Sequence, residues 1–382
     1  MGNVWHQRFV QTFKMRRIGL FLGLLAAATS ALACYNDVDT NLTELRDNLD
    51  VTLAVAGRFT IYPKEYYEKR IWIQSDILAK NPNNLEAYDN IAVAFDRIGD
   101  SANAMKWIHE KRKHLGANPG NQQLYSTEAN EGTILIVRWI REHKPGDVAD
   151  AVAAEKCIAK ALQINPNAHF GREFAQLYSI RALIQCGKND DWKEKFSETL
   201  ISVADKDHID HKKLRFGIAG MMVLGAAWTM PPMIQAIANL VPEEQQIVAL
   251  CEQRMLSLDW SNPELTFDDF PIKRNEKLNP VERPLIHRLL SNAQEFQINR
   301  QKWVSDQVAK GRYPDVDKDF WEGFKDVPPI PKSDYVVIRK KRIWEQPGGI
   351  MQLFILVGAG SAILVAIGYY IYRQMKLKMK GF

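Results

Sequence analysis

The stretch that decides the fold is NPNNLEAYDNIAVAFDRIGDSANAMKWIHEKRKHL, residues 81–115. Its apolar residues recur every three or four positions, which is the spacing of one face of an α-helix. One such stripe starts at Leu85, Gly99-Asp100 interrupts it as a turn, and a second stripe starts at Ala104. We therefore predict two short helices joined by a tight turn. Neither helix can bury its stripe alone, so the pair is expected to stack on neighbouring pairs.

This helix pair resembles a tetratricopeptide repeat (TPR). That family has a large, an apolar, a small and an aromatic residue on its first helix, a glycine at the turn, and a small residue where the second helix crosses the first. The matching positions in this chain are Tyr88, Ile91, Ala92, Phe95, Gly99 and Ala104. The chain departs from the pattern late in the second helix, where Lys111 stands in place of a small residue. The resemblance implies an all-α fold, a TPR-like helical-repeat solenoid.

Further helix pairs are predicted on the C-terminal side of this repeat. Residues 122–164 read as a pair with an extended first helix, and residues 170–204 read as a third pair. The uncharged run 216–241 is divided by Pro231-Pro232 into parts shorter than the ~20 residues that a bilayer span needs, so we predict another helix pair there. The predicted TPR-like domain covers residues 62–260.

Both ends of the chain have the composition of membrane-targeting segments. Residues 1–33 hold a basic region, a short apolar run and the small-x-small pattern of an export signal, so cleavage would leave Cys34 as the first residue. Cys34 in that position is a candidate for lipidation. The uncharged residues 347–372 predict a single transmembrane helix, and residues 373–382 a basic cytoplasmic tail.

The formal net charge of +5 comes from the two ends of the chain. Residues 1–33 and 373–382 each hold four basic and no acidic residues, which leaves −3 for the body. The basic balance therefore gives no support for nucleic-acid binding. Between the ends we predict a linker with a helix at 34–61. We also predict a proline-rich, mostly extended region at 261–346 with one helix from Pro284 to Lys310, which wraps the repeats or spaces them from the membrane.

The linker contains a partial calcium-binding pattern. Asp37, Asp39 and Asn41 have the spacing that opens a calcium loop. The glycine and the closing glutamate of that loop are missing, because Leu42 and Asn48 occupy their positions. We therefore interpret this stretch as a solvated linker and predict no metal site in it.

No pattern in the chain predicts a catalytic residue or a cofactor. His208 and His211 lie in the stretch DKDHIDHKK, residues 205–213, where the neighbouring lysines favour a solvated loop over a metal site. The widely spaced cysteines include no CxxC pair, and we expect Cys157 and Cys186 to be buried thiols rather than a disulfide. Enzyme function therefore has little support.

The resemblance also implies where a protein partner would bind. In the family, partners lie along the concave face that the first helices form. Carried over to the matched repeat, this face consists of Glu86, Asp89, Asn90, Val93, Asp96 and Arg97. Three acids among six residues predict a partner segment with basic residues. The alternative is an ordinary solvated helix face. Some family members clamp a C-terminal carboxylate with a lysine, but that position here is Asp89, so we expect no such clamp.

These observations favour a non-enzymatic, membrane-anchored TPR scaffold or adaptor that binds proteins at the cell envelope. Its repeat domain is expected in the periplasm and its tail in the cytoplasm. One alternative is a tail-anchored, cytosol-facing adaptor, which requires residues 1–33 to be retained. The other is a metal-dependent enzyme that uses His208 and His211.

Overall fold

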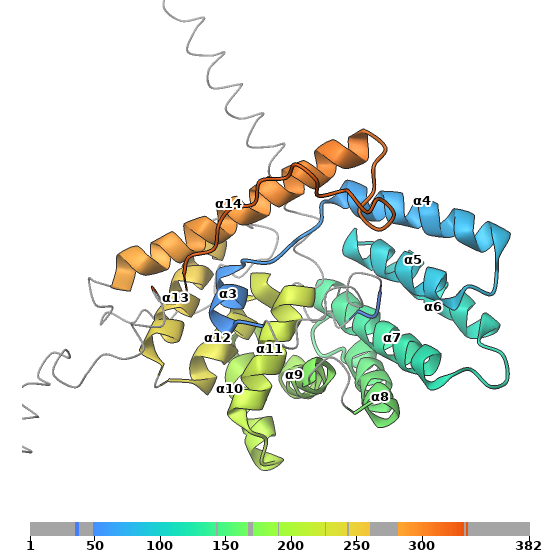
Figure 1. Cartoon of the computed structure of the whole chain (residues 1–382). Coiled ribbons are helices and arrows are strands. Elements are labelled where there is room, and N and C mark those ends of the chain that lie inside the picture. Colours follow the sequence, from blue (N-terminus) through green and yellow to red (C-terminus); the bar gives the residue numbers. More distant parts are fainter. Residues whose placement is uncertain are drawn as a thin grey trace, which may run out of the picture. The chain divides into compact units, whose positions relative to one another are not determined.

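The computed structural model of this chain describes residues 35–37, 49–142, 144–166, 171–189, 191–225, 227–242, 244–259, 282–331 and 334. These residues form α-helices, one 3-10 turn and no strand (Figure 1), so the predicted all-α class is confirmed for them. The helices are α3 (Val51–Ala56), α4 (Lys64–Lys80), α5 (Leu85–Arg97), α6 (Ser101–His114), α7 (Asn121–Glu142), α8 (Ala149–Ile164), α9 (Arg172–Gly187), α10 (Trp192–Lys206), α11 (His211–Leu224), η2 (Ala227–Thr229), α12 (Pro231–Leu240), α13 (Gln245–Asp259) and α14 (Glu282–Ala309).

The stretch 81–115 forms the two predicted helices, α5 and α6. The Asn84 side chain accepts a hydrogen bond from the Ala87 N–H (3.2 Å) and so begins α5. Gly99 follows α5 with φ of +93°, a left-handed conformation that glycine adopts without the strain of a side chain. The Asp100 side chain then accepts from the Asn103 N–H (3.0 Å) at the start of α6. The tight turn between the helices thus follows from local capping chemistry.

The helices stack in chain order. Each helix from α4 to α9 packs on the next one in the chain. In addition, α5 packs on α7, α9 on α11, and α10 on α12 (Figure 1). Most of the buried apolar side chains form one large cluster, which includes Ala54 on α3 and Ile286 on α14. Burial of this shared apolar surface stabilises helices that are too short to be stable alone.

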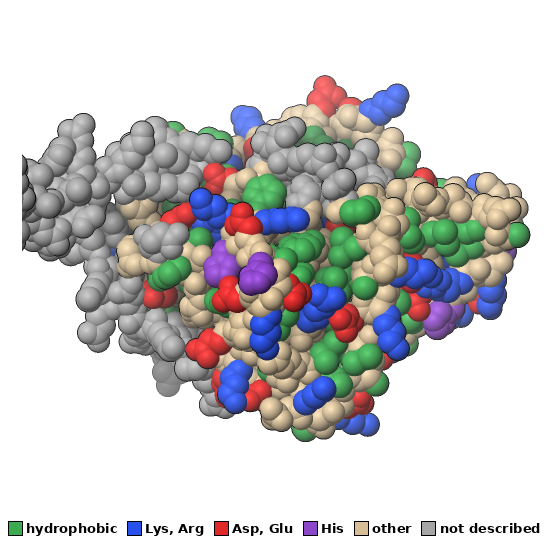
Figure 2. Space-filling model, turned by 90° about the horizontal axis from the view of Figure 1, so that it is seen from below, with side chains coloured by type: hydrophobic (Ala, Val, Ile, Leu, Met, Phe, Trp, Pro, Cys, Tyr) green, Lys and Arg blue, Asp and Glu red, His purple; other side chains and the backbone are tan. Residues whose placement is uncertain are grey.

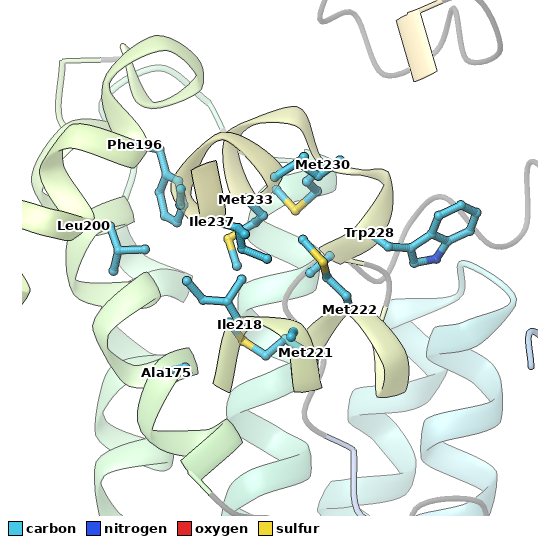
Figure 3. Close-up of a cluster of buried hydrophobic side chains, with 14 of the residues drawn as sticks. Ala175, Phe196, Leu200, Ile218, Met221, Met222, Trp228, Met230, Met233 and Ile237 are labelled. Atoms are coloured by element: carbon cyan, nitrogen blue, oxygen red, sulfur yellow. The ribbon is translucent and has the colours of Figure 1, made fainter. Parts of the chain in front are cut away.

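The uncharged run 216–241 is buried as a helix pair rather than extended as a membrane span. α11 ends at Leu224, and Pro231 and Pro232 open α12, where a missing backbone N–H costs no helical hydrogen bond. Figure 3 shows side chains from three helices gathered in this region. They are Phe196 and Leu200 from α10, Ile218, Met221 and Met222 from α11, and Met233 and Ile237 from α12.

A glycine sets the distance between α9 and α11. A Cβ atom added at Gly217 would lie 2.5 Å from the Ala175 Cβ and 2.7 Å from the Gly171 carbonyl oxygen. We expect Gly217→Ala to lower the free energy of unfolding by about 1–3 kcal/mol, because the overpacked helices must move apart. Urea unfolding followed by circular dichroism measures this change. The control is Gly120→Ala, whose Cβ meets nothing within 4 Å. Equal stability of the two variants would contradict the prediction.

α14 and the residues after it lie against the earlier helices. α14 contacts α3, α4 and α13, and in Figure 1 it runs across them. After α14 the chain turns back along it, so that the Trp303 Nε1–H donates to the Phe320 carbonyl oxygen (3.1 Å). Tyr313 and Phe320 are buried in a cluster with Tyr66 of α4. The part of the predicted 261–346 region from α14 to Phe320 therefore packs on the helix stack.

The described residues contain no helix that is both long and apolar enough to cross a membrane. The predicted export signal at 1–33, Cys34, the predicted span at 347–372 and the basic tail at 373–382 lie outside the described residues. All four therefore remain predictions.

Candidate functional site

Tyr35, Asn36 and Asp37 form a buried stretch of chain, which we name the docked segment. Their exposed fractions are 0%, 4% and 4%. The interpretation of residues 36–41 as a solvated linker is therefore wrong for Asn36 and Asp37, while Asp39 and Asn41 lie outside the described residues. The reason is that the backbone and side chains of the docked segment bond to residues of α4, α5, α7 and α9. These bonded residues are between 33 and 137 positions away in the sequence.

Asn130 on α7 holds the backbone of the docked segment. Its Oδ1 accepts a hydrogen bond from the Asn36 N–H (2.7 Å), and its Nδ2 donates to the Asn36 carbonyl oxygen (3.1 Å). The same Nδ2 donates to Asp89 Oδ1 (2.9 Å). Because a carboxylate only accepts, Asp89 fixes which end of the Asn130 amide faces each group. Asn130 thus recognises the main chain of Asn36 in a fixed orientation.

Asp89 is in turn held by buried donors. Its Oδ2 accepts from the Lys111 ammonium and from Ser126 Oγ (3.0 Å). Burial raises the pKa of the Asp89 carboxyl and lowers that of the Lys111 ammonium, while their pairing opposes both shifts. Lys111 is the residue that departs from the TPR pattern. In this structure its charge is used inside the chain, to support Asp89 behind Asn130.

The Tyr35 end of the docked segment is recognised by three helices. The Tyr35 hydroxyl donates to Asp96 on α5, and the Arg97 guanidinium lies over the Tyr35 ring, 4.6 Å from its centroid. The Tyr35 carbonyl oxygen accepts from Arg172 Nη2 on α9 (3.2 Å). Asp96 also accepts from Arg141 Nη1 on α7 (2.9 Å). The phenol is therefore read by both its ring and its hydroxyl.

The Asp37 end is recognised by Arg70 on α4. Arg70 is fully buried, and its Nη1 donates to Asp37 Oδ2 (3.0 Å). Its other nitrogens donate to Asp315 Oδ2, at 3.1 Å from Nε and 2.9 Å from Nη2. Tyr66 supports this arrangement by donating from its hydroxyl to Asp315 Oδ1 (2.8 Å). One guanidinium thus joins the docked segment and the residues after α14 to the same helix.

We name the side chains that contact the docked segment the docking face: Arg70, Asp96, Arg97, Asn130 and Arg172. They come from α4, α5, α7 and α9, so the face exists only when these helices are stacked. The Asn36 side chain is the exception in the segment. Its Nδ2 and Oδ1 are buried and make no hydrogen bond. The docking face therefore contacts the side chains of the first and third residues and the backbone of the first and second residues.

The structure places most of the predicted partner-binding residues inside the molecule. Asp89, Asn90, Val93 and Asp96 are buried, Arg97 is partly buried, and Glu86 is exposed. Asp96 and Arg97 contact the docked segment directly, and Asp89 acts through Asn130. The assumption that these side chains are open to solvent thus holds for Glu86 alone. Whether the face binds a basic partner stays a prediction.

The repeat-signature residues have packing roles. Ile91, Ala92 and Ala104 are fully buried, Tyr88 is 5% exposed, and Phe95 packs against the core. Gly99 forms the turn after α5. The TPR resemblance itself stays a prediction.

The described histidine and cysteine candidates are not grouped with other possible metal ligands. His211 Nε2 lies 2.7 Å from Asp205 Oδ1, and across the described ranges no three His, Cys, Asp or Glu side chains are grouped so that they could hold a metal ion. Cys186 is a buried free thiol, as predicted, whereas Cys157 is a free thiol that is only partly buried. Burial raises the pKa of each thiol to about 12. The face of the molecule in Figure 2 mixes acidic, basic and hydrophobic side chains. The docking face therefore remains the candidate site.

Arg70, Asn130 and Arg172 were not predicted from the sequence. A signal was available for Arg70 and Asn130, since both are polar residues at positions where the helical spacing predicts burial. Arg70 follows Tyr66 and Tyr67 by four and three positions, and Asn130 follows Ala129 and Ser126 on the buried side of α7. A buried polar residue needs a partner, so such an interruption of an apolar stripe points to a polar contact.

Comparisons of this chain with family models, with curated proteins and with solved structures gave no match. Its function is therefore inferred from the geometry of the docking face.

The docking of Tyr35 is expected to depend on pH. Burial, and then the charge of Asp96, hold the pKa of the Tyr35 phenol well above its usual value. An undocked tyrosine ionises near pH 10. The stabilisation that the phenol provides should therefore be complete below about pH 10 and decrease as the pH rises further. Urea unfolding of wild type and Tyr35→Phe between pH 8 and pH 11.5 measures this contribution. A stability difference that stays constant over that range would contradict the prediction.

Proposed function

We propose that this chain is a non-enzymatic, membrane-anchored scaffold of the TPR-like helical-repeat type, which holds protein partners at the cell envelope. Its described part is a stack of helix pairs, and the stretch 81–115 carries the repeat signature. The predicted span at 347–372 would anchor the chain, with the body in the periplasm and the tail in the cytoplasm.

The observation that carries this proposal is the docked segment. Three consecutive residues with a buried backbone are held by side chains from four stacked helices. The Asn130 amide pairs with both backbone groups of Asn36, which is a way to bind an extended peptide whatever its side chain at that position. This stack of helices therefore has the chemistry needed to recognise a polypeptide segment.

The position of the docked segment is also compatible with export. The predicted cleavage after Ala33 would leave Cys34 first and Tyr35 second. The docked segment would then begin directly after the new N-terminus. A lipid on Cys34 would bring the docking face close to the membrane surface.

The test is crosslinking of the full-length, tagged chain in its own cells, followed by affinity capture and mass spectrometry. We expect the same protein partners in independent preparations, and we expect them to be envelope proteins. Intact mass and N-terminal sequencing of the captured chain should show a start at Cys34. The matched control is the same preparation without crosslinker.

Two outcomes would overturn the proposal. If the chain is captured without any reproducible protein partner, the proposed scaffold function is wrong. A chain that starts at Met1, with partners from the cytosol, would favour the tail-anchored adaptor instead.

A further inference from the structure

The docked segment is held by bonds that a segment of another protein could also make. Its contacts include side-chain contacts to the Tyr35 phenol and the Asp37 carboxylate and hydrogen bonds to the backbone of Tyr35 and Asn36. No covalent bond joins it to the docking face. The Asn36 side chain makes no hydrogen bond, so no side-chain bond restricts the middle position.

We propose that the docked segment is an internal ligand, and that the docking face takes an extended partner segment with a tyrosine and, two positions later, an acidic residue. This proposal rests on the proposed scaffold function and names its ligand. The partner segment would replace Tyr35–Asp37, so the chain blocks its own binding face until a competing segment arrives.

The charge of the docking face favours this ligand over the basic one that the sequence alone predicts. Two of the three acids of α5 that predict a basic partner are already paired inside the chain, Asp89 with Lys111 and Asp96 with Arg141. The docking face instead presents Arg70, and Arg70 is bonded to an aspartate of the segment. A carboxylate in the third position is therefore matched to a guanidinium, and the tyrosine hydroxyl in the first position is matched to a carboxylate.

The internal ligand competes strongly because it is tethered. Eleven residues separate Asp37 from Leu49, which precedes α3. A short tether gives an effective concentration of the order of millimolar, so a free peptide at micromolar concentration binds wild type poorly. Weakening the internal ligand should then increase the affinity for a free peptide.

The experiment uses a fluorescent synthetic peptide, acetyl-Tyr-Asn-Asp-Val-Asp-Thr-Asn, which has the sequence of residues 35–41. It is titrated against the full-length chain in detergent, as wild type and as the double variant Tyr35→Phe/Asp37→Asn. We expect the double variant to bind the peptide at least tenfold more tightly than wild type does. A control peptide with Phe in the first position and Asn in the third should bind the variant at least tenfold more weakly.

Two further substitutions in the double variant locate the binding. Asn130→Ala should abolish binding of the peptide, because the backbone contacts are lost. Asp76→Asn should leave it unchanged, since Asp76 is exposed on α4 and paired with Lys80. Binding that survives Asn130→Ala would place the peptide elsewhere and overturn the proposal.

Other outcomes also decide the proposal. Equal binding by wild type and a double variant that circular dichroism shows to be folded would overturn it. If the double variant does not fold, amide hydrogen exchange of the wild-type chain is measured with and without the peptide instead. Millimolar peptide should then speed the exchange of residues 35–37, and unchanged exchange would overturn the proposal.

A dimer in which two copies exchange their docked segments would overturn the proposal that another protein supplies the partner segment. It would show self-association instead. If crosslinking captures protein partners but no variant binds the peptide, this inference is wrong and the scaffold proposal still holds.

Discussion

Replacing Arg70 by methionine is expected to lower the free energy of unfolding by about 3–5 kcal/mol, which is the usual cost of removing one partner from a buried ion pair. Arg70 is fully buried, and its guanidinium donates to both Asp37 and Asp315. Methionine fills a similar volume but donates no hydrogen bond. Two carboxylates would therefore stay buried without their cation.

The matched control is Lys80→Met, which removes the same charge from the same helix. Lys80 pairs with Asp76, but both side chains are mostly exposed, at 74% and 52%. An exposed pair contributes about 0–1 kcal/mol, so this variant should be nearly as stable as wild type. Urea unfolding compares the two variants. Equal loss of stability in both would contradict the role that we assign to Arg70.

Hydrogen exchange should also separate the two substitutions. Arg70 bonds to the docked segment and to Asp315 after α14, so Arg70→Met should speed amide exchange in both places. Lys80→Met should speed neither. Such a result would show that one side chain couples two parts of the chain that are 278 positions apart, at Asp37 and Asp315.

The sequence predicted the helices well because their signals are local. The stripe from Leu85, the turn at Gly99-Asp100 and the proline pair at Pro231 each act within a few residues. The structure has α5, α6 and α12 at these places. Capping and apolar spacing set such boundaries whatever the rest of the chain does.

The docking face could not be predicted in the same way, because its parts meet only in the folded chain. Asn36 and Asn130 are 94 positions apart, and Tyr35 and Arg172 are 137 apart. Helical spacing can show that Arg70 or Asn130 interrupts an apolar stripe, but it cannot name the partner. The TPR resemblance did point to α5 as a binding helix, and two of its residues, Asp96 and Arg97, do contact the docked segment.

Asp96 and Glu86 give the sharpest test of what the acids of α5 do. Both were predicted to bind a basic partner, yet Asp96 is fully buried and Glu86 is exposed. Asp96 accepts hydrogen bonds from the Tyr35 hydroxyl, from Ser101 Oγ (2.9 Å) and from Arg141 Nη1 (2.9 Å). We expect Asp96→Ala to lower the free energy of unfolding by about 3–5 kcal/mol, since Arg141 and Tyr35 both lose a buried acceptor.

Glu86→Ala removes an acid from the same helix and should change the free energy of unfolding by less than about 0.5 kcal/mol. Asp96→Asn keeps the shape and one acceptor oxygen, so its loss should lie between the two. Urea unfolding of the three variants tests this order. A stable Asp96→Ala variant that has lost a captured partner would show instead that Asp96 serves binding. The expected order would mean that Asp96 of α5 serves to hold residues 35–37 of its own chain.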